Sequence, residues 1–380
     1  MTRPLRLLPI PAGPDAADVL SALATALDDD GPAFLPVPRD DERETLRLTD
    51  ALGPGEPVDS AVSLVIATSG TTGTPKGAML SASALRASGN ATHARLGGPG
   101  SWLLALPAHH IAGLQVLLRS VLAGTDPVIL DVSAGFDPAA LVPAVASMTG
   151  PRKYTSLVPT QLVKALTHPD ATAALASLDA VLLGGAATPA PVLAKAAEAG
   201  IHVVRTYGMS ETCGGCVYDG MPLDDVRVRI DDGRVLLGGP VLARGYRGMP
   251  DHPAFAQPGW FRTDDAGTVT DGVLRITGRL DEAISTGGLT VVPQVVEAAI
   301  SEHPGIRECA VIGVPDERLG QRVVAVVVGD EPPSLDQLRA FVSRTLDVTA
   351  APRELHVVDA LPLRGPGKVD RQALVTRFRP

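Results

Sequence analysis

Ala67-Thr-Ser-Gly-Thr-Thr-Gly-Thr-Pro-Lys-Gly77 comes at the end of an apolar run, Leu64–Ala67, that is typical of a buried strand. The segment combines hydroxyl side chains, glycines and one lysine, and its candidate anion-binding residues are Thr68, Ser69, Gly70, Thr71, Thr72, Gly73 and Lys76. Glycines let backbone N–H groups approach an anion, hydroxyls add donors, and the lysine adds positive charge. The pattern predicts a phosphate-binding loop after a strand. The alternative interpretation is a surface loop rich in Ser, Thr and Gly.

This segment is not a P-loop of the Walker type. That motif places Gly directly before the lysine and Ser or Thr directly after it, whereas Pro75 and Gly77 flank Lys76. Phosphoryl transfer by a P-loop enzyme is therefore disfavoured.

Short apolar runs alternate with helical patterns around and after the loop. The expected strands are Leu64–Ala67, Trp102–Leu106, Val128–Leu130, Tyr154–Val158, Ala180–Leu183 and Ile201–Val204. The expected helices are Ser81–Arg95, Gly113–Ala123, Thr160–Leu166 and Pro189–Ala199. Strands that are apolar on both faces and alternate with helices favour an α/β fold with an open, doubly wound, mostly parallel sheet.

The pattern changes after about residue 220. Asp-Gly turns separate strands of alternating polarity, which predicts an antiparallel β subdomain over Val226–Ile230, Val235–Gly238 and Val273–Ile276. From Asp281 onward we expect helices at Pro293–Ser301 and Leu335–Leu346 and strands at Glu308–Val314, Arg322–Val328 and Glu354–Val358. The sequence thus predicts a large N-terminal domain over residues 1–280 and a small, mobile α+β domain over residues 281–380.

Composition limits the class of protein. The chain has 380 residues and a formal net charge of −9, without the basic surplus of a general nucleic-acid-binding protein. No apolar run approaches the roughly 20 residues of a membrane span, and the first residues lack the apolar core of a signal peptide. The cysteines, Cys213, Cys216 and Cys309, are too few for a disulfide framework. We expect a cytoplasmic protein with no nucleic-acid partner and no membrane span.

Further motifs follow the loop in order. They are Pro107-Ala-His-His-Ile-Ala-Gly113, Tyr207-Gly-Met-Ser-Glu-Thr212, Trp260-Phe-Arg-Thr-Asp-Asp265, Gly278-Arg-Leu-Asp281 and Gly365-Pro-Gly-Lys-Val-Asp-Arg371. Together with Ser69–Gly77, they resemble the AMP-forming adenylating enzymes, which include acyl-CoA synthetases, adenylation domains and luciferases. The resemblance implies that a carboxylate attacks the α-phosphate of ATP to give an acyl-adenylate, and that CoA then displaces AMP.

Two runs narrow this resemblance. Arg205-Thr-Tyr-Gly-Met-Ser-Glu-Thr-Cys-Gly-Gly-Cys-Val-Tyr-Asp-Gly220 and Asp281-Glu-Ala-Ile-Ser-Thr-Gly-Gly288 are similar to the short o-succinylbenzoate–CoA ligases of menaquinone biosynthesis. This implies ATP and CoA as substrates, Mg²⁺ as cofactor and an aryl dicarboxylate as the acid. One alternative is a ligase for another aryl or acyl acid, with CoA or a carrier protein as acceptor. Another is a catalytically silent nucleotide-binding protein, against which the presence of Lys368 and Glu211 argues.

The resemblance also implies roles for single residues. Lys368 would bridge the acid oxygen and the α-phosphate, since two anions must meet there. Glu211 would hold Mg²⁺, which prefers oxygen ligands. Arg279, with Lys368 and Glu211, completes the catalytic candidates. Beyond the phosphate loop, the residues expected around ATP or AMP are Gly184, Gly185, Ala186, Thr206, Tyr207, Gly208, Met209, Ser210, Asp265, Arg279 and Lys368.

The acid is expected beside the nucleotide. His110 would lie at the mouth of the acid pocket, and the other candidates there are Ser156, Thr160, Gly208, Gly214 and Gly215. The neighbouring His109 could instead be a structural residue. The small side chains of Cys213-Gly-Gly-Cys216 would leave room for an aromatic ring. A redox dithiol or half a zinc site are the alternatives, but one Cys-x-x-Cys without further ligands is a weak signal.

The resemblance further implies alternation between two domain positions. Asp281 would be the hinge, and Gly287 and Gly288 would line the path of CoA. The chain before residue 60 is short for the family, so neighbouring subunits could cover what it leaves exposed, as a homo-oligomer. Two positions depart from the family pattern: Asp264 stands where Gly is usual, and Val295 where Glu is common.

Overall fold

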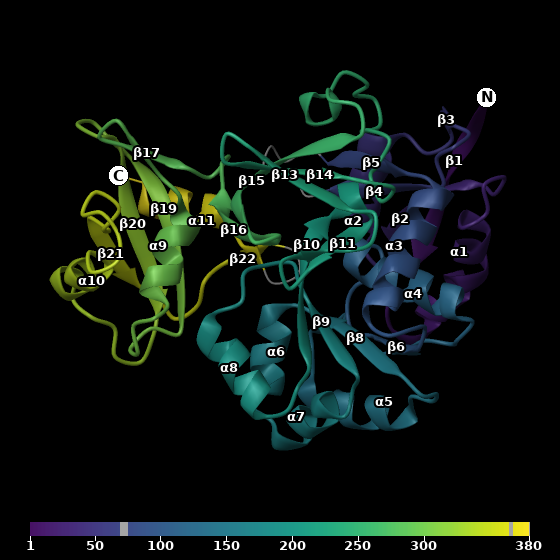
Figure 1. Ribbon diagram of the computed structural model, residues 1–380, viewed down its shortest axis with the longest axis horizontal. Coiled ribbons are helices and arrows are strands. Elements are labelled where there is room, and N and C mark those ends of the chain that lie inside the picture. Colours follow the sequence, from purple (N-terminus) through teal and green to yellow (C-terminus); the bar gives the residue numbers. More distant parts are fainter. Residues whose placement is uncertain (69–74, 365–367, 380) are drawn as a thin grey trace. The chain divides into compact units, whose positions relative to one another are not determined.

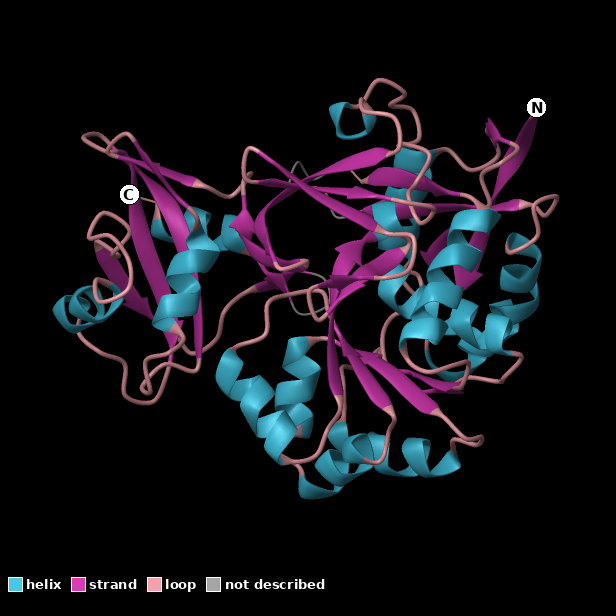
Figure 2. Ribbon diagram, in the orientation of Figure 1, coloured by secondary structure: helices cyan, strands magenta, loops and turns pink. Residues whose placement is uncertain are grey.

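The computed structural model describes residues 1–68, 75–364 and 368–379. The chain forms two compact units (Figures 1 and 2), one of Met1–Arg229 with Leu236–Arg262 and the other of Ile230–Val235 with Thr263–Pro380. Within the described ranges, none of the helices is both long enough and apolar enough to span a bilayer. The sequence predicts a boundary between residues 280 and 281, at which the small C-terminal domain would rotate. This boundary stays a prediction.

A five-stranded sheet in the first unit carries the two ends of the phosphate loop. Its strand order is β3 (Pro57–Asp59), β1 (Thr2–Ile10), β2 (Ala33–Pro38), β4 (Leu64–Thr68) and β5 (Lys76–Leu80). The helix α2 (Glu42–Leu52) packs Leu48 and Leu52 into the core beneath β1 and β2. β4 and β5 are antiparallel, and their register pairs Thr68 with Lys76. The sheet thus holds the first and last described residues of the loop side by side.

This sheet differs from the sequence-based expectation. We expected Leu64–Ala67 to belong to the parallel α/β sheet, and this expectation is wrong; it joins strands before residue 60 that the sequence analysis did not identify. The strand β4 instead has β2 on one edge, in parallel, and β5 on the other, so no edge remains for the parallel sheet. Pro4 and Pro9 interrupt the apolar pattern of β1. Because Pro cannot donate a hydrogen bond to a neighbouring strand, the sequence did not indicate a strand here. The helix α1 (Leu20–Ala26) follows β1 in the chain.

The expected parallel sheet is present in the first unit. Its order is β12 (Met221–Pro222), β11 (Gly214–Tyr218), β10 (Val203–Met209), β9 (Ala180–Leu183), β8 (Lys153–Leu157), β6 (Ser101–Leu104) and β7 (Val128–Ile129). The pairs from β10 to β7 are parallel, whereas β11 and β12 run antiparallel. This confirms the doubly wound, mostly parallel arrangement and adds an antiparallel edge.

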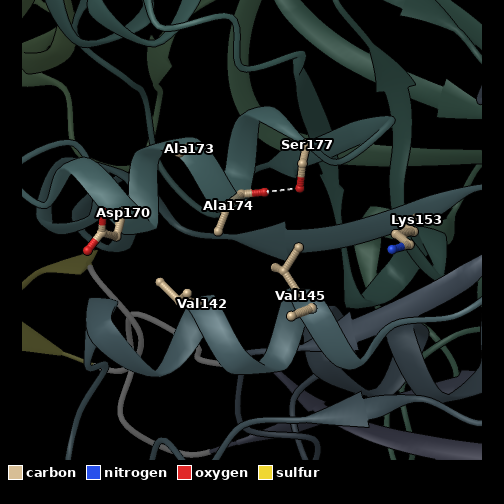
Figure 3. Close-up of a pocket in the computed structure, with 8 residues that line it drawn as sticks. Val142, Val145, Lys153, Asp170, Ala173, Ala174 and Ser177 are labelled. Carbon is tan, nitrogen blue, oxygen red and sulfur yellow. Dashed lines mark hydrogen bonds between the residues drawn. The ribbon is translucent and has the colours of Figure 1, made fainter.

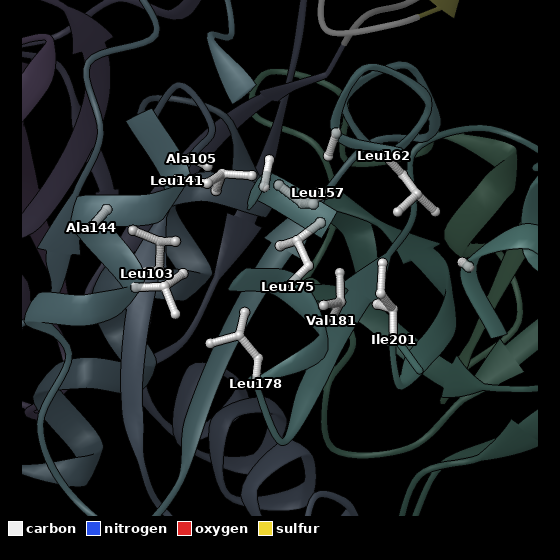
Figure 4. Close-up of a cluster of buried hydrophobic side chains, with 14 of the residues drawn as sticks. Leu103, Ala105, Leu141, Ala144, Leu157, Leu162, Leu175, Leu178, Val181 and Ile201 are labelled. Atoms are coloured by element: carbon white, nitrogen blue, oxygen red, sulfur yellow. The ribbon is translucent and has the colours of Figure 1, made fainter. Parts of the chain in front are cut away.

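Helices cover the parallel strands because those strands are apolar on both faces. Leu141 of α5 (Leu141–Ser147), Leu162 of α6 (Pro159–Ala165) and Leu175 of α7 (Pro169–Ala176) form one core cluster with Leu103, Leu157 and Val181 of the sheet (Figure 4). The remaining helices of this unit are α3 (Ala82–Arg95), α4 (Ile111–Ala123) and α8 (Ala190–Glu198). These bounds agree with the expected helices to within a few residues.

The antiparallel subdomain is also confirmed. Its strands are β13 (Arg227–Asp231), β14 (Arg234–Gly238), β15 (Trp260–Thr270) and β16 (Val273–Arg279), in that order. The register of β15 and β16 pairs Asp265 with Arg279. This pairing places two of the expected nucleotide-binding residues side by side.

The rest of the second unit is an α+β layer structure. Its sheet has the order β18 (Leu289–Val291), β17 (Ile284–Thr286), β20 (Gly320–Val328) and β19 (Glu308–Asp316), and β21 (Glu354–Val357) pairs in parallel with β20. Alternate residues of β19 and β20 point to opposite faces. One face packs on α9 (Pro293–Ile300) and α10 (Leu335–Val342), and the other on α11 (Arg371–Phe378). A small hairpin of β22 (Leu363–Arg364) and β23 (Lys368–Val369) precedes α11.

Candidate active site

The phosphate loop leaves the sheet between β4 and β5. Thr68 and Lys76 are paired across the two strands, and both are half-buried. The predicted residues Ser69, Gly70, Thr71, Thr72 and Gly73 lie outside the described residues. The described part therefore fixes where the loop begins and ends, and it places the Lys76 side chain.

Lys76 and Glu211 meet around the ring of Tyr246. The Nζ of Lys76 lies 5.2 Å from the centroid of the Tyr246 ring, within the range of a cation–π contact. The hydroxyl of Tyr246 donates a hydrogen bond to Oε1 of Glu211 over 2.5 Å, and Glu211 is only 6% exposed. His252 completes the group, because its Nε2 lies 3.1 Å from the Nζ of Lys76. We call these four residues the Tyr246 cluster.

Backbone pairing positions Tyr246 between the two predicted residues. The segment of residues 243–247 runs beside β5, with an antiparallel bridge between Ala78 and Tyr246. The Arg247 N–H donates to the carbonyl of Gly77 over 2.8 Å, and the Ala243 N–H donates to the carbonyl of Glu211 over 2.8 Å. The segment is therefore bonded to the phosphate-loop strand and to the Glu211 turn at once. Sequence reasoning missed Tyr246 and His252, because neither lies in the motifs that we singled out.

Glu211 is carried by a tight 3₁₀ turn, η3 (Ser210–Thr212). Cys213 ends the turn with φ at +54°, in the left-handed region that few non-glycine residues adopt. Two buried side chains hold this residue in place: the Cys213 carbonyl accepts hydrogen bonds from Ser88 Oγ over 3.1 Å and from Gln115 Nε2 over 2.7 Å. These bonds from α3 and α4 fix the turn and hence the position of Glu211.

Several residues expected around ATP or AMP lie close together at the ends of β9 and β10. A Cβ atom at Gly184 would come within 2.4 Å of the Thr206 hydroxyl oxygen, and one at Gly208 within 2.0 Å of the Gly214 carbonyl oxygen. Glycine is therefore required at both positions. Gly185 adopts φ +85°, while Ala186 is exposed and Tyr207, Met209 and Ser210 continue from β10 into the Glu211 turn. The structure thus brings these predicted residues together.

The predicted acid-binding residues come from neighbouring elements. His110 is the N-cap residue of α4, and the same helix reaches the Gly214 turn, since a Cβ at Gly214 would contact Gln115 and Ile111. Ser156 is buried in β8, Thr160 is half-buried at the start of α6, and Gly215 follows Gly214 in β11. All belong to the first unit.

The two adjacent histidines differ in surroundings. The rings of His109 and His110 lie 4.1 Å apart. Burial, together with the neighbouring His110, lowers the pKa of His109 to about 3. His109 is therefore neutral at physiological pH, as a structural histidine would be. The described residues contain no group of three or more His, Cys, Asp or Glu side chains that could hold a metal ion.

Cys213 and Cys216 lie in the interior. Both thiols are fully covered, and burial raises the pKa of Cys216 to about 12 and that of Cys213 well above its ordinary value. A thiol must lose its proton to act as a nucleophile or a metal ligand. The structure thus favours the interpretation in which these residues provide small, inert side chains.

Asp265 and Arg279 form an ion pair in the second unit. Arg279 approaches Asp265 Oδ1 with one guanidinium nitrogen at 3.4 Å, and it forms two hydrogen bonds to Asp281, at 2.8 and 2.6 Å. Burial acts to lower the pKa of Arg279, but the carboxylates of Asp281, Asp265 and Glu282 together raise it above its ordinary value. Arg279 is therefore a permanent cation that links Asp265, an expected nucleotide-binding residue, to the expected hinge Asp281.

Asp264 and Val295 are the two departures from the family pattern. The Asp264 carboxylate points to Arg234, with 3.0 Å between Oδ1 and a guanidinium nitrogen. Its charge is thus balanced within the antiparallel sheet. Val295 lies in α9, and nothing in the structure explains this substitution.

The remaining predicted residues also belong to the second unit. Gly287 and Gly288 adopt φ +57° and +81° in the turn between β17 and β18. Two successive positive φ values are typical of a hairpin turn that requires glycine. Lys368 begins β23, where its backbone pairs with Arg364. Asp370 follows the hairpin and caps α11, its side chain accepting a hydrogen bond from the Ala373 N–H over 3.0 Å.

A cavity of about 380 Å³ lies elsewhere in the first unit, between α5 and α7 (Figure 3). Val142, Val145, Ala173 and Ala174 line most of it, with Lys153 and Asp170 at its edges. Lys153 begins β8, whereas Ser156 stands near the opposite end of this strand. The cavity includes none of the predicted site residues.

Together, these features suit a nucleotide with its metal. One buried carboxylate, Glu211, fits the way in which Mg²⁺ is commonly bound, through one or two carboxylates and the phosphates of a substrate. Lys76 supplies a cation nearby, and its Nζ lies against the ring of Tyr246, whose hydroxyl binds Glu211. The charges of these residues are therefore compatible with a magnesium–polyphosphate ligand.

Comparison with known proteins defines the class. The family model for AMP-binding enzymes matches residues 14–246, and the model for the C-terminal domain of AMP-binding enzymes matches residues 295–368. The chain belongs to the family of AMP-binding enzymes.

Particular relatives cover the chain almost completely. A Mycobacterium tuberculosis protein described as a probable 2-succinylbenzoate–CoA ligase is 61% identical over 381 residues, covering 98% of both chains. A feruloyl-CoA synthase of an Amycolatopsis species is 32% identical, over 98% of this chain and 75% of its own. Among solved structures, Escherichia coli MenE with a bound analogue of OSB-AMS matches with a TM-score of 0.76 at 26% identity, over 99% of this chain and 88% of its own.

Proposed function

We propose that this protein is an ATP-dependent, AMP-forming 2-succinylbenzoate–CoA ligase of menaquinone biosynthesis. The observation that carries the proposal is the 61% identity, over 98% of both chains, to the mycobacterial protein described by that activity. The Tyr246 cluster supports it, because Lys76 and Glu211 are held as a phosphate-binding cation and a metal-binding carboxylate would be. A cytoplasmic location follows from the same assignment.

The reaction has two steps. In the first, a carboxylate oxygen of the acid forms a bond to the α-phosphorus of ATP, and the bond from that phosphorus to the leaving pyrophosphate oxygen breaks. In the second, the sulfur of CoA forms a bond to the acyl carbon, and the bond to AMP breaks. Both steps bring anions together, so positive charge near the phosphates lowers the barrier.

Each group of residues has a role in this scheme. Lys368 would approach the acid and the α-phosphate, and Asp265 with Arg279 would hold the ribose and phosphates. Gly184 to Ala186 and Tyr207 would enclose adenine, and His110 with the Gly214 turn would border the acid. Glu211 would hold Mg²⁺, whose chemistry is to neutralise charge on the triphosphate. Gly287 and Gly288 would line the CoA path after rotation about Asp281.

Pyrophosphate release tests the proposal. The purified protein is incubated with ATP, Mg²⁺, CoA and 2-succinylbenzoate, with a fatty acid and benzoate as control acids. We expect release that depends on 2-succinylbenzoate and a matching yield of its CoA thioester. Release no greater than with the control acids would reject this substrate.

A second candidate is a ligase for another aryl acid. The 32% identity to a feruloyl-CoA synthase, over 98% of this chain, favours an aryl acid over an unrelated one. The same assay across a panel of aryl and acyl acids, with CoA or a carrier protein as acceptor, distinguishes the two candidates. Size-exclusion chromatography with light scattering tests whether the protein forms a homo-oligomer.

A further inference from the structure

The Arg247 side chain joins the segment that carries Tyr246 to the C-terminal end of the helix α2. Its guanidinium donates hydrogen bonds to the carbonyls of Leu52 over 2.5 Å, Gly53 over 2.9 Å and Pro57 over 3.2 Å. Leu52 ends α2 and Gly53 is the C-cap residue, so neither carbonyl has a partner within the helix. A cation at the carbonyl end of a helix is also favoured by the helix dipole.

The guanidinium of Arg247 is held in one position. Only 11% of its side chain is exposed, and Glu56 approaches it from the surface with 3.3 Å between Oε2 and a guanidinium nitrogen. A guanidinium presents its donors in a rigid fork, so it can bind several carbonyls at once, whereas an ammonium cannot match the same set. The end of α2 and the turn that follows it therefore fix where Arg247 lies.

The backbone of Arg247 is bound on its other side to the strand β5. Its N–H donates to the carbonyl of Gly77 over 2.8 Å. Glycine is required at position 77, because a Cβ atom there would lie 2.8 Å from Cδ2 of Leu52 and 3.4 Å from Cβ of Arg247. Arg247 thus stands where α2, β5 and the Tyr246 segment meet.

The Tyr246 segment turns away from β5 directly after Arg247. The Tyr246 carbonyl accepts a hydrogen bond from the Met249 N–H over 3.1 Å, and Gly248 between them has φ +70°. Backbone at the end of a paired stretch opens at a lower free-energy cost than backbone inside a sheet. The Arg247 side chain closes this end, and so it restrains the Tyr246 hydroxyl that binds Glu211.

We propose that Arg247 is a positioning residue for the candidate magnesium site. It fixes the Tyr246 segment against α2, and Tyr246 in turn orients the Glu211 carboxylate. This inference rests on the proposed ATP-dependent function and on Glu211 as the metal ligand. Arg247 itself acts only through Tyr246. Through it, the end of α2 supports Mg²⁺ binding, although α2 carries none of the predicted site residues.

Two variants of Arg247 and one matched control test the proposal. Arg247→Met keeps an unbranched side chain and removes every donor, whereas Arg247→Lys keeps the charge and N–H donors without the fork. Arg86→Met is the control. Arg86 of α3 likewise donates to a carbonyl at the end of a helix, that of Leu27 after α1, and pairs with Asp29.

ATP affinity is measured by calorimetry for each protein, once with saturating Mg²⁺ and once with EDTA, without any acid. For Arg247→Met we expect about 10-fold weaker binding with Mg²⁺, as for the loss of one hydrogen bond to a charged group. Binding in EDTA should change little, because Lys76 keeps its place on β5. Arg247→Lys should recover part of the loss, and Arg86→Met should bind ATP as the wild type does in both conditions.

Thermal unfolding establishes that each protein is folded at the temperature of the measurement. If Arg247→Met does not fold, Arg247→Lys decides, because it should still show a smaller loss that is confined to Mg²⁺. Wild-type affinities in both conditions for the folded Arg247 variants would overturn the proposal.

Two further results would also overturn it. An equal loss with Mg²⁺ and with EDTA means that Arg247 supports the fold rather than the metal ligand, and so does an equal loss in Arg86→Met. Because no acid is present, these results leave the acid specificity untouched. A wild-type protein that does not bind ATP would refute the proposed function and this inference with it.

Discussion

The hydroxyl of Tyr246 donates a hydrogen bond to Oε1 of Glu211 over 2.5 Å, across 35 residues of sequence. The same ring lies 5.2 Å from the Nζ of Lys76. One aromatic residue thereby sets the distance between the candidate metal ligand and the phosphate-loop cation. A hydrogen bond to a charged group stabilises it by about 1.5–3 kcal/mol.

Tyr246→Phe removes this hydrogen bond and keeps the ring beneath Lys76. We expect kcat/KM for adenylation to fall by about 10- to 100-fold, and the Mg²⁺ concentration for half-maximal rate to rise, because Glu211 is no longer oriented. Pyrophosphate exchange measured over a Mg²⁺ titration checks this. Thermal unfolding controls for the fold. A Mg²⁺ dependence equal to that of the wild type would show that Tyr246 does not orient Glu211.

Substitution of Lys368 is expected to separate the two half-reactions. Lys368→Ala should reduce adenylate formation by about 100-fold or more, since a key charge stabiliser is lost. Transfer of the acyl group from preformed acyl-adenylate to CoA should change much less. The first rate is measured by pyrophosphate exchange and the second by single-turnover thioester formation. Equal losses in both assays would contradict the assigned role.

Asp281 is tested by two substitutions with different effects on the backbone. Asp281→Pro restricts φ and should impair one half-reaction more than the other. Asp281→Ala removes the two hydrogen bonds to Arg279 but leaves the backbone free. If the position is a hinge, the imbalance between half-reactions appears in Asp281→Pro and is smaller in Asp281→Ala. The same imbalance in both variants would assign the effect to Arg279 instead.

Arg371 follows the lysine segment and holds two carboxylates of the second unit. Its guanidinium contacts Glu297 at 2.5 Å and Glu282 at 3.3 Å, and the Val311 N–H donates to Glu297 over 2.7 Å. Removing one partner of a fully buried ion pair costs about 3–5 kcal/mol. Arg371 and Glu297 are only half-buried, so we expect Arg371→Met to lower the unfolding free energy by less than this amount, about 1–3 kcal/mol. Hydrogen exchange of β19 and β20 measures it.

The loss in Arg371→Met should depend on pH. Burial raises the pKa of Glu297, and Arg371 opposes this effect. A raised folded-state pKa means that stability decreases as pH rises through the ionisation of Glu297. Without Arg371 this pKa is higher still, so the deficit should be larger at pH 7 than at pH 5. Adding Glu297→Leu should restore much of the stability. A loss of stability that is equal at pH 5 and pH 7, and that Glu297→Leu does not reduce, would contradict the pairing.

His93 makes stability depend on pH in the opposite direction. Burial, with the nearby Arg119, lowers the pKa of His93 to about 4, and its Nε2 accepts a hydrogen bond from Trp102. Between about pH 4 and the ordinary value near 6.5, the unfolded chain binds more protons than the folded one, so unfolding free energy falls as pH falls. His93→Gln should flatten this dependence in denaturant titrations. The exposed His168→Gln serves as the control and should leave the slope as it is.

Local patterns in the sequence determined most of the element positions. The strand expected at Ala180–Leu183 has these bounds in the structure, and the helix expected at Ser81–Arg95 begins one residue later, because Ser81 is its cap. Apolar periodicity and capping residues act over a few positions, so they can be recognised without a structure. The phosphate loop was predicted from its own residue types, whereas Glu211, Asp265 and Arg279 were singled out by the resemblance of short motifs to a known family.

Contacts between distant segments needed the tertiary structure. His252 meets Lys76 across 176 residues, Asp264 is balanced by Arg234 on a neighbouring strand, and β4 joins a sheet built by the first 60 residues. No periodic pattern in the sequence predicts these contacts, because each depends on how separate elements pack. The sequence by itself indicated the family chemistry and the groups expected to carry it. Only the packing of remote elements decided which side chains hold those groups in position.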